Sequence, residues 1–365
     1  FSGSAGFAVV LKSKNYLFVD GRYTIQAKNE SGSQFKIIEV PKYSFENILK
    51  DKPKKLNLGF DPQLFTNFSI KKKFKKNVRL IPIKENLIDK LINLKKTNKS
   101  ITKFYNIKKE VSGESINSKI NRLLKKLNSN RIDNIFISAP ENVAWLLNLR
   151  GRDNPNSPIP NCKLIFTKNK KIFFFSCPKK ISKMKTKKEY KKLKFCQYNN
   201  FNEIVKSLKG KSFCIDEISC SITNEDVIQS YFKIKSRVDP CYSMKSIKNK
   251  VEIENMIQSH LLDGVALTKF IYWIKKINKK KITEIDAQKK LENFRKLNKN
   301  YLFPSFNTIA GTGSNGAIVH YRAQKETNKE IKKNHIFLCD SGGQYNYGTT
   351  DVTRTICFSK PKKSI

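Results

Sequence analysis

Two aspartates near the end of this chain are placed where they could act together. The stretch CDSGGQYNYGTTDVTRTI carries Asp340 and Asp351 on either side of a glycine-rich turn, with apolar, strand-forming residues flanking it. Side chains alternate between the two faces of a strand, so folding the second strand back on the first can point both carboxylates to one place. Two unneutralised carboxylates repel and one pKa rises, whereas a cation such as Mn²⁺, Mg²⁺ or Zn²⁺ between them removes the repulsion.

The same residues also fit a purely structural interpretation. Aspartate before Ser-Gly is common in turns, and Asp351 can simply pair with Arg354. Spacing alone therefore leaves two hypotheses open, a metal site and a pair of turn residues.

The chain has three histidines, and one of them is a candidate for chemistry. His260 falls on the apolar side of a predicted helix and is expected in the core, while His335 falls in a polar loop and is expected to be exposed. His320 ends a predicted strand at 317–321, directly after a glycine-rich turn. The glycines of that turn have the spacing of a dinucleotide-binding motif, but the motif needs a helix after the glycines, so we expect only a turn between strands.

The elements that must position these residues form a helix-then-sheet unit. Apolar residues from Ile253 to Ile274 keep one face, which predicts a helix over 252–276. Thr283 with Asp286 resembles a capping box and predicts the start of a second helix. The predicted strands cover 306–310, 317–321, 336–341 and 350–358.

The preceding residues alternate between strand and helix patterns, which indicates an α/β fold. Phe7–Leu11 and Asn15–Tyr23 are predicted to be neighbouring strands joined by a short polar turn. We expect three domains, at 1–96, 97–241 and 242–365. The chain begins without a methionine and ends just after a strand, so we expect it to be a piece of a longer protein.

Composition narrows the possible functions. Lys and Arg number 73 and Asp and Glu 30, so the net charge is +43, a field that can attract nucleic acid or anionic membrane. The lysines are spread along the chain, however, which is typical of solvated surfaces. No apolar run is long enough to span a bilayer. The eight cysteines form no CxxC pair, which favours reduced thiols, and Cys339 is expected to be a small core residue.

Several stretches, taken in order, resemble one family. SFNTIAGTGSNGAIVHYRAQKETNK and FLCDSGGQYNYGTTDVTRTICF are similar to the catalytic domain of Xaa-Pro aminopeptidases (aminopeptidase P), in the creatinase/methionine aminopeptidase superfamily with the pita-bread fold. FSGSAGFAVV, FVDGRYTIQA and AWLLNLRGRDNPNSPIP resemble the two creatinase-like domains that precede it. The resemblance covers essentially the whole chain and implies two creatinase-like α/β domains followed by a pita-bread domain.

The resemblance also implies roles for particular residues. Asp340 and Asp351 match the first two metal ligands, with Asp351 expected to bridge two ions. His320 matches a catalytic histidine that hydrogen-bonds the substrate near the scissile bond. Arg354 is expected to orient the carboxylates, and Arg150 and Asp153 are expected to line the substrate cleft.

The implied activity is removal of an N-terminal residue when proline follows, by a metal-bridging hydroxide. The implied cofactors are two divalent ions, most typically Mn²⁺, with Zn²⁺ or Co²⁺ as alternatives. The implied setting is a cytoplasmic homodimer that acts on proline-containing peptides, without specific nucleic-acid or membrane binding. A creatinase or prolidase on the same fold remains an alternative hydrolase.

The family pattern requires a histidine and two glutamates after Asp351, and the chain ends at Ile365 before any of them. We therefore expect this chain by itself to be inactive and prone to aggregate. The alternative from a different class is a pita-bread protein that has lost catalysis and binds a protein or nucleic acid.

Overall fold

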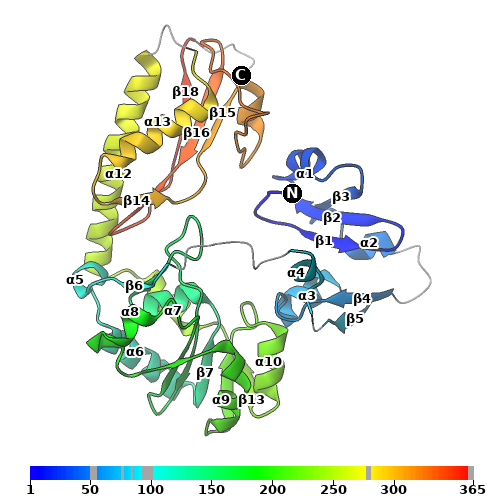
Figure 1. The fold of residues 1–365 in the computed structure, drawn as a ribbon, viewed down its shortest axis with the longest axis vertical. Helices are drawn as coiled ribbons and strands as arrows, with labels where there is room; N and C mark the ends of the chain where they lie inside the picture. Colours follow the sequence, from blue (N-terminus) through cyan, green and yellow to red (C-terminus); the bar gives the residue numbers. More distant parts are fainter. Residues whose placement is uncertain (50–55, 75–77, 84, 93–101, 277–280, 361–365) are drawn as a thin grey trace. The chain divides into compact units, whose positions relative to one another are not determined.

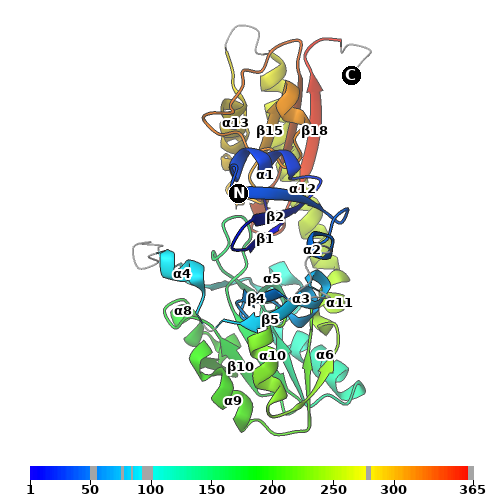
Figure 2. The same ribbon diagram turned by 90° about the vertical axis from the view of Figure 1, so that its right-hand side faces the viewer.

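The computed structural model describes residues 1–49, 56–74, 78–83, 85–92, 102–276 and 281–360. The chain divides into two compact units, one made of Phe1–Ile48 with Glu254–Ile365 and the other of Leu49–Ile253. They are called the first and the second unit below, and Figures 1 and 2 show the elements of each. The domain boundary expected near residue 96 lies outside the described residues.

The N-terminal part of the first unit is a small three-stranded sheet. Strands β1 and β2 pair antiparallel, as predicted, and β2 pairs parallel with β3 after a crossover through α1. Leu17, Val19, Tyr23 and Ala27 form its buried core. The elements are β1 (Phe7–Val10), β2 (Asn15–Asp20), α1 (Thr24–Glu30), β3 (Phe35–Val40) and α2 (Phe45–Leu49).

The rest of the first unit packs helices against a three-stranded sheet. Strands β15, β16 and β18 are antiparallel in that order, and β14 pairs with β17 beside them. Phe270 and Leu291 of the helices lie in one apolar cluster with Phe337 and Ile356 of the sheet. The elements are α12 (Lys250–Lys276), α13 (Glu284–Lys296), β14 (Tyr301–Pro304), β15 (Ile309–Thr312), the 3-10 helix η4 (Gly313–Ala317), β16 (Ile336–Ser341), β17 (Gly343–Tyr345) and β18 (Val352–Cys357).

The second unit is built on a mixed six-stranded sheet in the order β11-β10-β9-β7-β12-β13. Its central strands are buried along their whole length, and apolar clusters cover both faces. The sheet strands are β7 (Asn134–Ile137), β9 (Lys163–Thr167), β10 (Ile172–Phe175), β11 (Leu193–Cys196), β12 (Ser212–Ile215) and β13 (Lys233–Ser236).

The second unit also contains two further pairs of strands and several helices. Strands β4 and β5 form a separate parallel pair, and β6 pairs antiparallel with β8. The bounds are β4 (Leu56–Phe60), α3 (Asn67–Lys73), β5 (Val78–Pro82), α4 (Leu87–Leu91), β6 (Tyr105–Asn106), α5 (Lys109–Ser112), α6 (Ile116–Ser129), α7 (Pro140–Leu146), β8 (Leu149–Arg150), α8 (Ser182–Lys185), η2 (Lys188–Tyr190), η3 (Tyr198–Asn200), α9 (Phe201–Ser207), α10 (Ile222–Gln229) and α11 (Pro240–Ser246).

Three expectations for the first unit are wrong. The strand predicted at 306–310 is β15, which runs from Ile309 to Thr312, and residues 305–308 form no strand. Residues 317–321 do not form a strand; the 3-10 helix η4 and a turn occupy this stretch. The predicted apolar face of α12 is also wrong in its first half, because His260 is exposed, as are Ile257 and Leu261 at 57% and 59%. The buried face there carries Ser259 and Asp263 instead.

Other expectations are confirmed. Strand β16 has the predicted bounds, and Thr283 and Asp286 form the predicted capping box at the start of α13. All eight cysteines are free thiols, and Cys339 is a buried core residue. Among the described residues, none of the helices combines the length and the apolar character needed to cross a bilayer.

Candidate active site

The register of two strands brings the two aspartates together. In the antiparallel pair of β16 and β18, Asp340 lies opposite Thr353, and Asp351 directly precedes β18 on the same face. Burial raises the pKa of Asp351, and the charge of Asp340 and a hydrogen bond between the two side chains raise it further. The structure therefore places the two carboxylates against each other, as the spacing predicted.

The turn between these strands is held by glycines and by a threonine. A Cβ atom on Gly342 would lie 1.9 Å from the carbonyl oxygen of Thr350, so no larger residue fits there. The backbone N–H of Gly343 donates to Thr350 Oγ1 at 2.9 Å. This close approach fixes where Asp351 begins the returning strand.

The chemistry of the carboxylate pair fits a divalent cation. Asp340 Oδ1 is buried and accepts no hydrogen bond from any residue that the structure describes. Such an oxygen is costly unless a donor or a cation satisfies it, and carboxylate oxygens are the ligands that Mn²⁺ and Mg²⁺ prefer. Over the described ranges, no group of three or more His, Cys, Asp or Glu side chains gathers, so the pair supplies only part of a coordination shell.

His320 lies on an exposed turn in a strained backbone conformation. Its φ is 57°, in the left-handed region that residues other than glycine seldom adopt. Its ring nitrogen Nδ1 lies 2.6 Å from the hydroxyl of Tyr23. The exposed position leaves the imidazole accessible to a ligand, and the strain requires neighbouring contacts to hold the turn.

A buried glutamate holds that turn in place. Glu284, at the start of α13, has no exposed surface, and its carboxylate accepts from the backbone N–H groups of Thr312 at 2.8 Å and Lys329 at 3.1 Å. It also accepts from Asn315 Nδ2 at 3.0 Å and from the Tyr321 hydroxyl at 2.9 Å. Since Asn315 and Tyr321 flank His320 in sequence, these bonds fix both ends of the turn.

A second buried charge lies behind β16. The guanidinium of Arg295 donates to both oxygens of Asp263 at 2.7 and 3.1 Å and to Ser341 Oγ at 3.0 Å. Tyr345 also donates to Asp263, at 2.8 Å. Burial alone would lower the pKa of Arg295, but the hydrogen bond and the charge of Asp263 raise it, so the guanidinium stays charged. This network anchors the end of the strand that carries Asp340.

Neither of these buried charges was predicted from the sequence. Glu284 follows the cap residue Thr283, where an acidic side chain is usually a solvent-exposed partner of the helix dipole. The signal for Arg295 is its position one turn after Leu291, on the apolar side of α13, and a charge there indicates a buried partner.

The remaining candidate residues are not brought to the carboxylates. Arg354 lies opposite Cys339, so it is on the other face of the sheet from Asp340, and its Nη1 donates to the carbonyl of Thr353. Arg150 and Asp153 belong to the second unit and make their contacts there.

Those contacts are local to one loop region. Arg150 Nη1 donates to the carbonyl of Leu149 at 2.9 Å, and burial lowers the pKa of this guanidinium. Asp153 pairs with Lys180 and accepts the backbone N–H of Asn161 at 2.6 Å. Their role at a substrate cleft stays a prediction.

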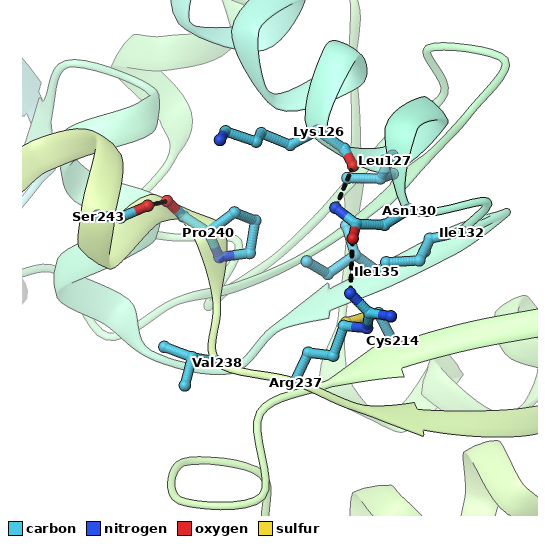
Figure 3. Close-up of a pocket in the computed structure, with 10 residues that line it drawn as sticks. All are labelled: Lys126, Leu127, Asn130, Ile132, Ile135, Cys214, Arg237, Val238, Pro240 and Ser243. Atoms are coloured by element: carbon cyan, nitrogen blue, oxygen red, sulfur yellow. Dashed lines mark hydrogen bonds between the residues drawn. The ribbon is translucent and has the colours of Figure 1, made fainter.

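A cavity of about 380 Å³ lies in the second unit (Figure 3). Its walls include Leu127, Ile132 and Ile135. At its rim, Asn130 donates to the carbonyl of Lys126 and accepts from Arg237. None of the predicted site residues lines this cavity.

Comparison with known protein families gives three matches in order along the chain. A Creatinase/Prolidase N-terminal domain matches residues 1–91, a second such domain matches 95–252, and Metallopeptidase family M24 matches 254–365. The last match contains His320 and both aspartates.

Individual relatives agree with these matches. Xaa-Pro aminopeptidase ApepP of Drosophila melanogaster is 34% identical over 99% of this chain and 61% of its own length. Xaa-Pro aminopeptidase 1 of Dictyostelium discoideum is 31% identical over 99% of this chain and 60% of its own length.

A solved structure has the same fold. The X-prolyl aminopeptidase of Caenorhabditis elegans, described as a cytosolic enzyme with a di-nuclear active site, superposes with a TM-score of 0.90 at 26% identity. The match covers 100% of this chain and 62% of that protein, so the chain spans about 60% of the length of its relatives. The chain therefore carries two creatinase-like N-terminal domains followed by a metallopeptidase family M24 domain with the pita-bread fold, and over its length it is similar to Xaa-Pro aminopeptidases.

Proposed function

We propose that the protein containing this chain is a metal-dependent aminopeptidase that releases the N-terminal residue from peptides with proline in second position. The observation that carries the proposal is the placement of Asp340 and Asp351 on one face of the β16–β18 pair, with the buried Oδ1 of Asp340 left without a partner among the described residues. The M24 match over this segment and the names of the relatives support it. They do not favour the alternative of a binding module without catalysis.

In this proposal Asp340 and Asp351 hold the cations. A pair of divalent ions, when bound, supplies an activated water and polarises the scissile carbonyl. Mn²⁺ is the proposed metal because carboxylate oxygens suit it, with Zn²⁺ and Co²⁺ as alternatives.

His320 acts on the substrate in this proposal. Its imidazole is exposed on the turn, and a ring N–H can donate to the developing oxyanion of the scissile carbonyl. An Xaa-Pro bond has no N–H of its own, so the enzyme must orient the substrate through its carbonyl and its free amine. A positioned donor is therefore required, and the buried Glu284 holds the turn that carries it.

We also propose the organisation around this site. The proposed domains are 1–96, 97–241 and 242–365. The three family matches follow in the same order, but they put the second boundary at 252–254. The protein is proposed to be cytoplasmic, since the worm relative is described as cytosolic. We also propose that it is a homodimer and that it acts on proline-containing peptides.

The test is hydrolysis of paired peptides by the full-length protein with Mn²⁺. The peptides differ only in proline or alanine at the second position. We expect release of the first residue from the proline peptide alone, loss of activity with a chelator, and loss in Asp351→Asn. Equal cleavage of both peptides, or full activity in Asp351→Asn, contradicts the proposal.

A further inference from the structure

The strained histidine of the candidate site contacts a side chain from the other end of the sequence. Tyr23 comes from the small N-terminal sheet, 297 residues before His320, and its hydroxyl lies 2.6 Å from Nδ1 of the imidazole. The two rings lie 5.4 Å apart between centroids, inclined at 51°. The sequence match to family M24 begins only at residue 254, so it does not include this tyrosine.

Tyr23 is itself firmly held. It is 1% exposed and precedes α1, where its backbone N–H donates to the carbonyl of Asp20 at 3.0 Å. The guanidinium carbon of Arg22 lies 5.2 Å from the centroid of the Tyr23 ring. This guanidinium donates two hydrogen bonds to the carboxylate of Asp20, at 2.9 and 2.8 Å. A buried and constrained phenol presents its hydroxyl in one direction, so it can set the state of the ring that it touches.

The hydrogen bonds around Tyr23 can be completed in one consistent direction. Ser4 Oγ lies against the same hydroxyl on its other side. A phenol has one proton to donate and can also accept. If Ser4 donates to Tyr23, then Tyr23 donates to Nδ1 of His320, Nδ1 carries no proton, and the neutral ring carries its proton on Nε2.

We propose that Tyr23 is a positioning residue for His320, and that it fixes the neutral tautomer whose Nε2–H donates to the substrate. The inference rests on the proposed aminopeptidase function for its catalytic consequence, but the tautomer itself does not depend on that function. The N-terminal sheet thereby contributes directly to the candidate site. Tyr23 does not touch the substrate in this proposal and acts only through the histidine.

The first experiment reads the tautomer without metal and without activity. The full-length protein is labelled with ¹⁵N-histidine, and the His320 signals are assigned by their absence in His320→Gln. We expect Nδ1 unprotonated and Nε2 protonated in the neutral ring. In Tyr23→Phe both tautomers become populated, and the two nitrogen shifts move toward each other. Identical shifts in wild type and Tyr23→Phe, or a proton on Nδ1 in wild type, overturn the proposal.

The second experiment measures turnover of the Mn²⁺-loaded protein. Loss of one positioning hydrogen bond in Tyr23→Phe is expected to lower kcat about tenfold with KM unchanged. Ser4 is exposed, so Ser4→Ala leaves the fold intact and is expected to lower kcat less than Tyr23→Phe does. The matched control is Tyr16→Phe, a buried tyrosine of β2 that packs against Phe18 and is expected to change neither quantity.

The two experiments separate the possible failures. If no variant or wild type cleaves Xaa-Pro peptides but the tautomer shifts as expected, the proposed function fails and the role of Tyr23 stands. If activity is present but Tyr23→Phe changes neither the tautomer nor kcat, the role of Tyr23 is wrong and the function stands. If Tyr23→Phe does not fold, Ser4→Ala is measured in its place, and a proton on Nδ1 of His320 in that protein overturns the inference.

Discussion

Two sheets of this molecule, the six-stranded sheet of the second unit and the sheet of β15, β16 and β18 in the first unit, are stabilised in different ways. In the second unit, β7, β10 and β12 are buried along their whole length, and apolar clusters lie on both faces. In the first unit, β16 alternates between buried and half-buried residues. Buried Glu284 bonds the end of the neighbouring strand β15 at Thr312, and buried Arg295 bonds Ser341 at the end of β16. The first arrangement only has to be stable, while the second also has to hold Asp340 and the turn of His320 in fixed positions.

The largest difference between the sheets is expected from loss of Arg295. In Arg295→Met the carboxylate of Asp263 stays buried without its cation, which costs about 3–5 kcal/mol of unfolding free energy in the first unit. Hydrogen exchange followed by mass spectrometry reports each unit separately, and β16 peptides should lose protection while β9 peptides do not.

The matched control is Lys296→Met, the next residue of α13, which is exposed and pairs loosely with Glu292 at 3.6 Å. We expect it to change protection by less than about 0.5 kcal/mol. A loss in Lys296→Met as large as that in Arg295→Met would contradict the role given to the buried pair.

Glu284→Gln is expected to have the next largest effect, confined to the turn of His320. The amide replaces one acceptor oxygen with a donor that faces other donors, which costs about 2–3 kcal/mol. Exchange should rise across residues 311–329, and kcat of the Mn²⁺-loaded protein should fall. Glu326→Gln, an exposed residue on the same turn region, serves as control. Unchanged exchange in Glu284→Gln would rule out its holding role.

The stability of the six-stranded sheet in the second unit should depend on the volume of its buried side chains and not on buried charges. Ile137 in β7 has no exposed surface, and Ile137→Val is expected to cost about 0.5–1.5 kcal/mol through the lost methylene. The protection of β7 and β9 peptides measures this change. Ile218→Val, at a residue that is 61% exposed, should leave it unchanged. Equal losses in both variants would mean that burial does not determine the stability of this unit.

The smallest expected effect concerns the carboxylate pair without metal. The pKa of Asp351 is raised in the folded chain, so ionising this group favours the unfolded state. The destabilisation is absent at a pH below the pKa of Asp351 in both the unfolded and the folded chain. It develops as pH rises from the unfolded-state pKa to the higher folded-state pKa. Asp340→Asn removes the neighbouring charge and should reduce the fall in Tm between acidic and neutral pH in the presence of a chelator. A larger fall in Asp340→Asn would contradict the repulsion.

Local patterns predicted much of the first unit because their physical causes are local. The capping box at Thr283 and Asp286 fixes the start of α13, and alternation of apolar residues fixes the bounds of β16. The meeting of Asp340 and Asp351 followed from alternation and one glycine turn.

The failures have nonlocal causes. Residues 317–321 have β-forming side chains, but bonds from Glu284 to Asn315 and Tyr321 hold this stretch as a turn. The first half of α12 buries Ser259 and Asp263 because Gly348 approaches one and Arg295 pairs with the other. The contact between Tyr23 and His320 spans 297 residues, and no pattern in the sequence predicts such a pairing.

The measurement that tests the central claim most directly is anomalous X-ray diffraction from crystals of the full-length protein grown with Mn²⁺. We predict two manganese peaks in contact with the carboxylates of Asp340 and Asp351, with Asp351 between them, and loss of these peaks in Asp351→Asn. Peaks bound elsewhere with both carboxylates free, or peaks unchanged in Asp351→Asn, would contradict the assignment of the metal site.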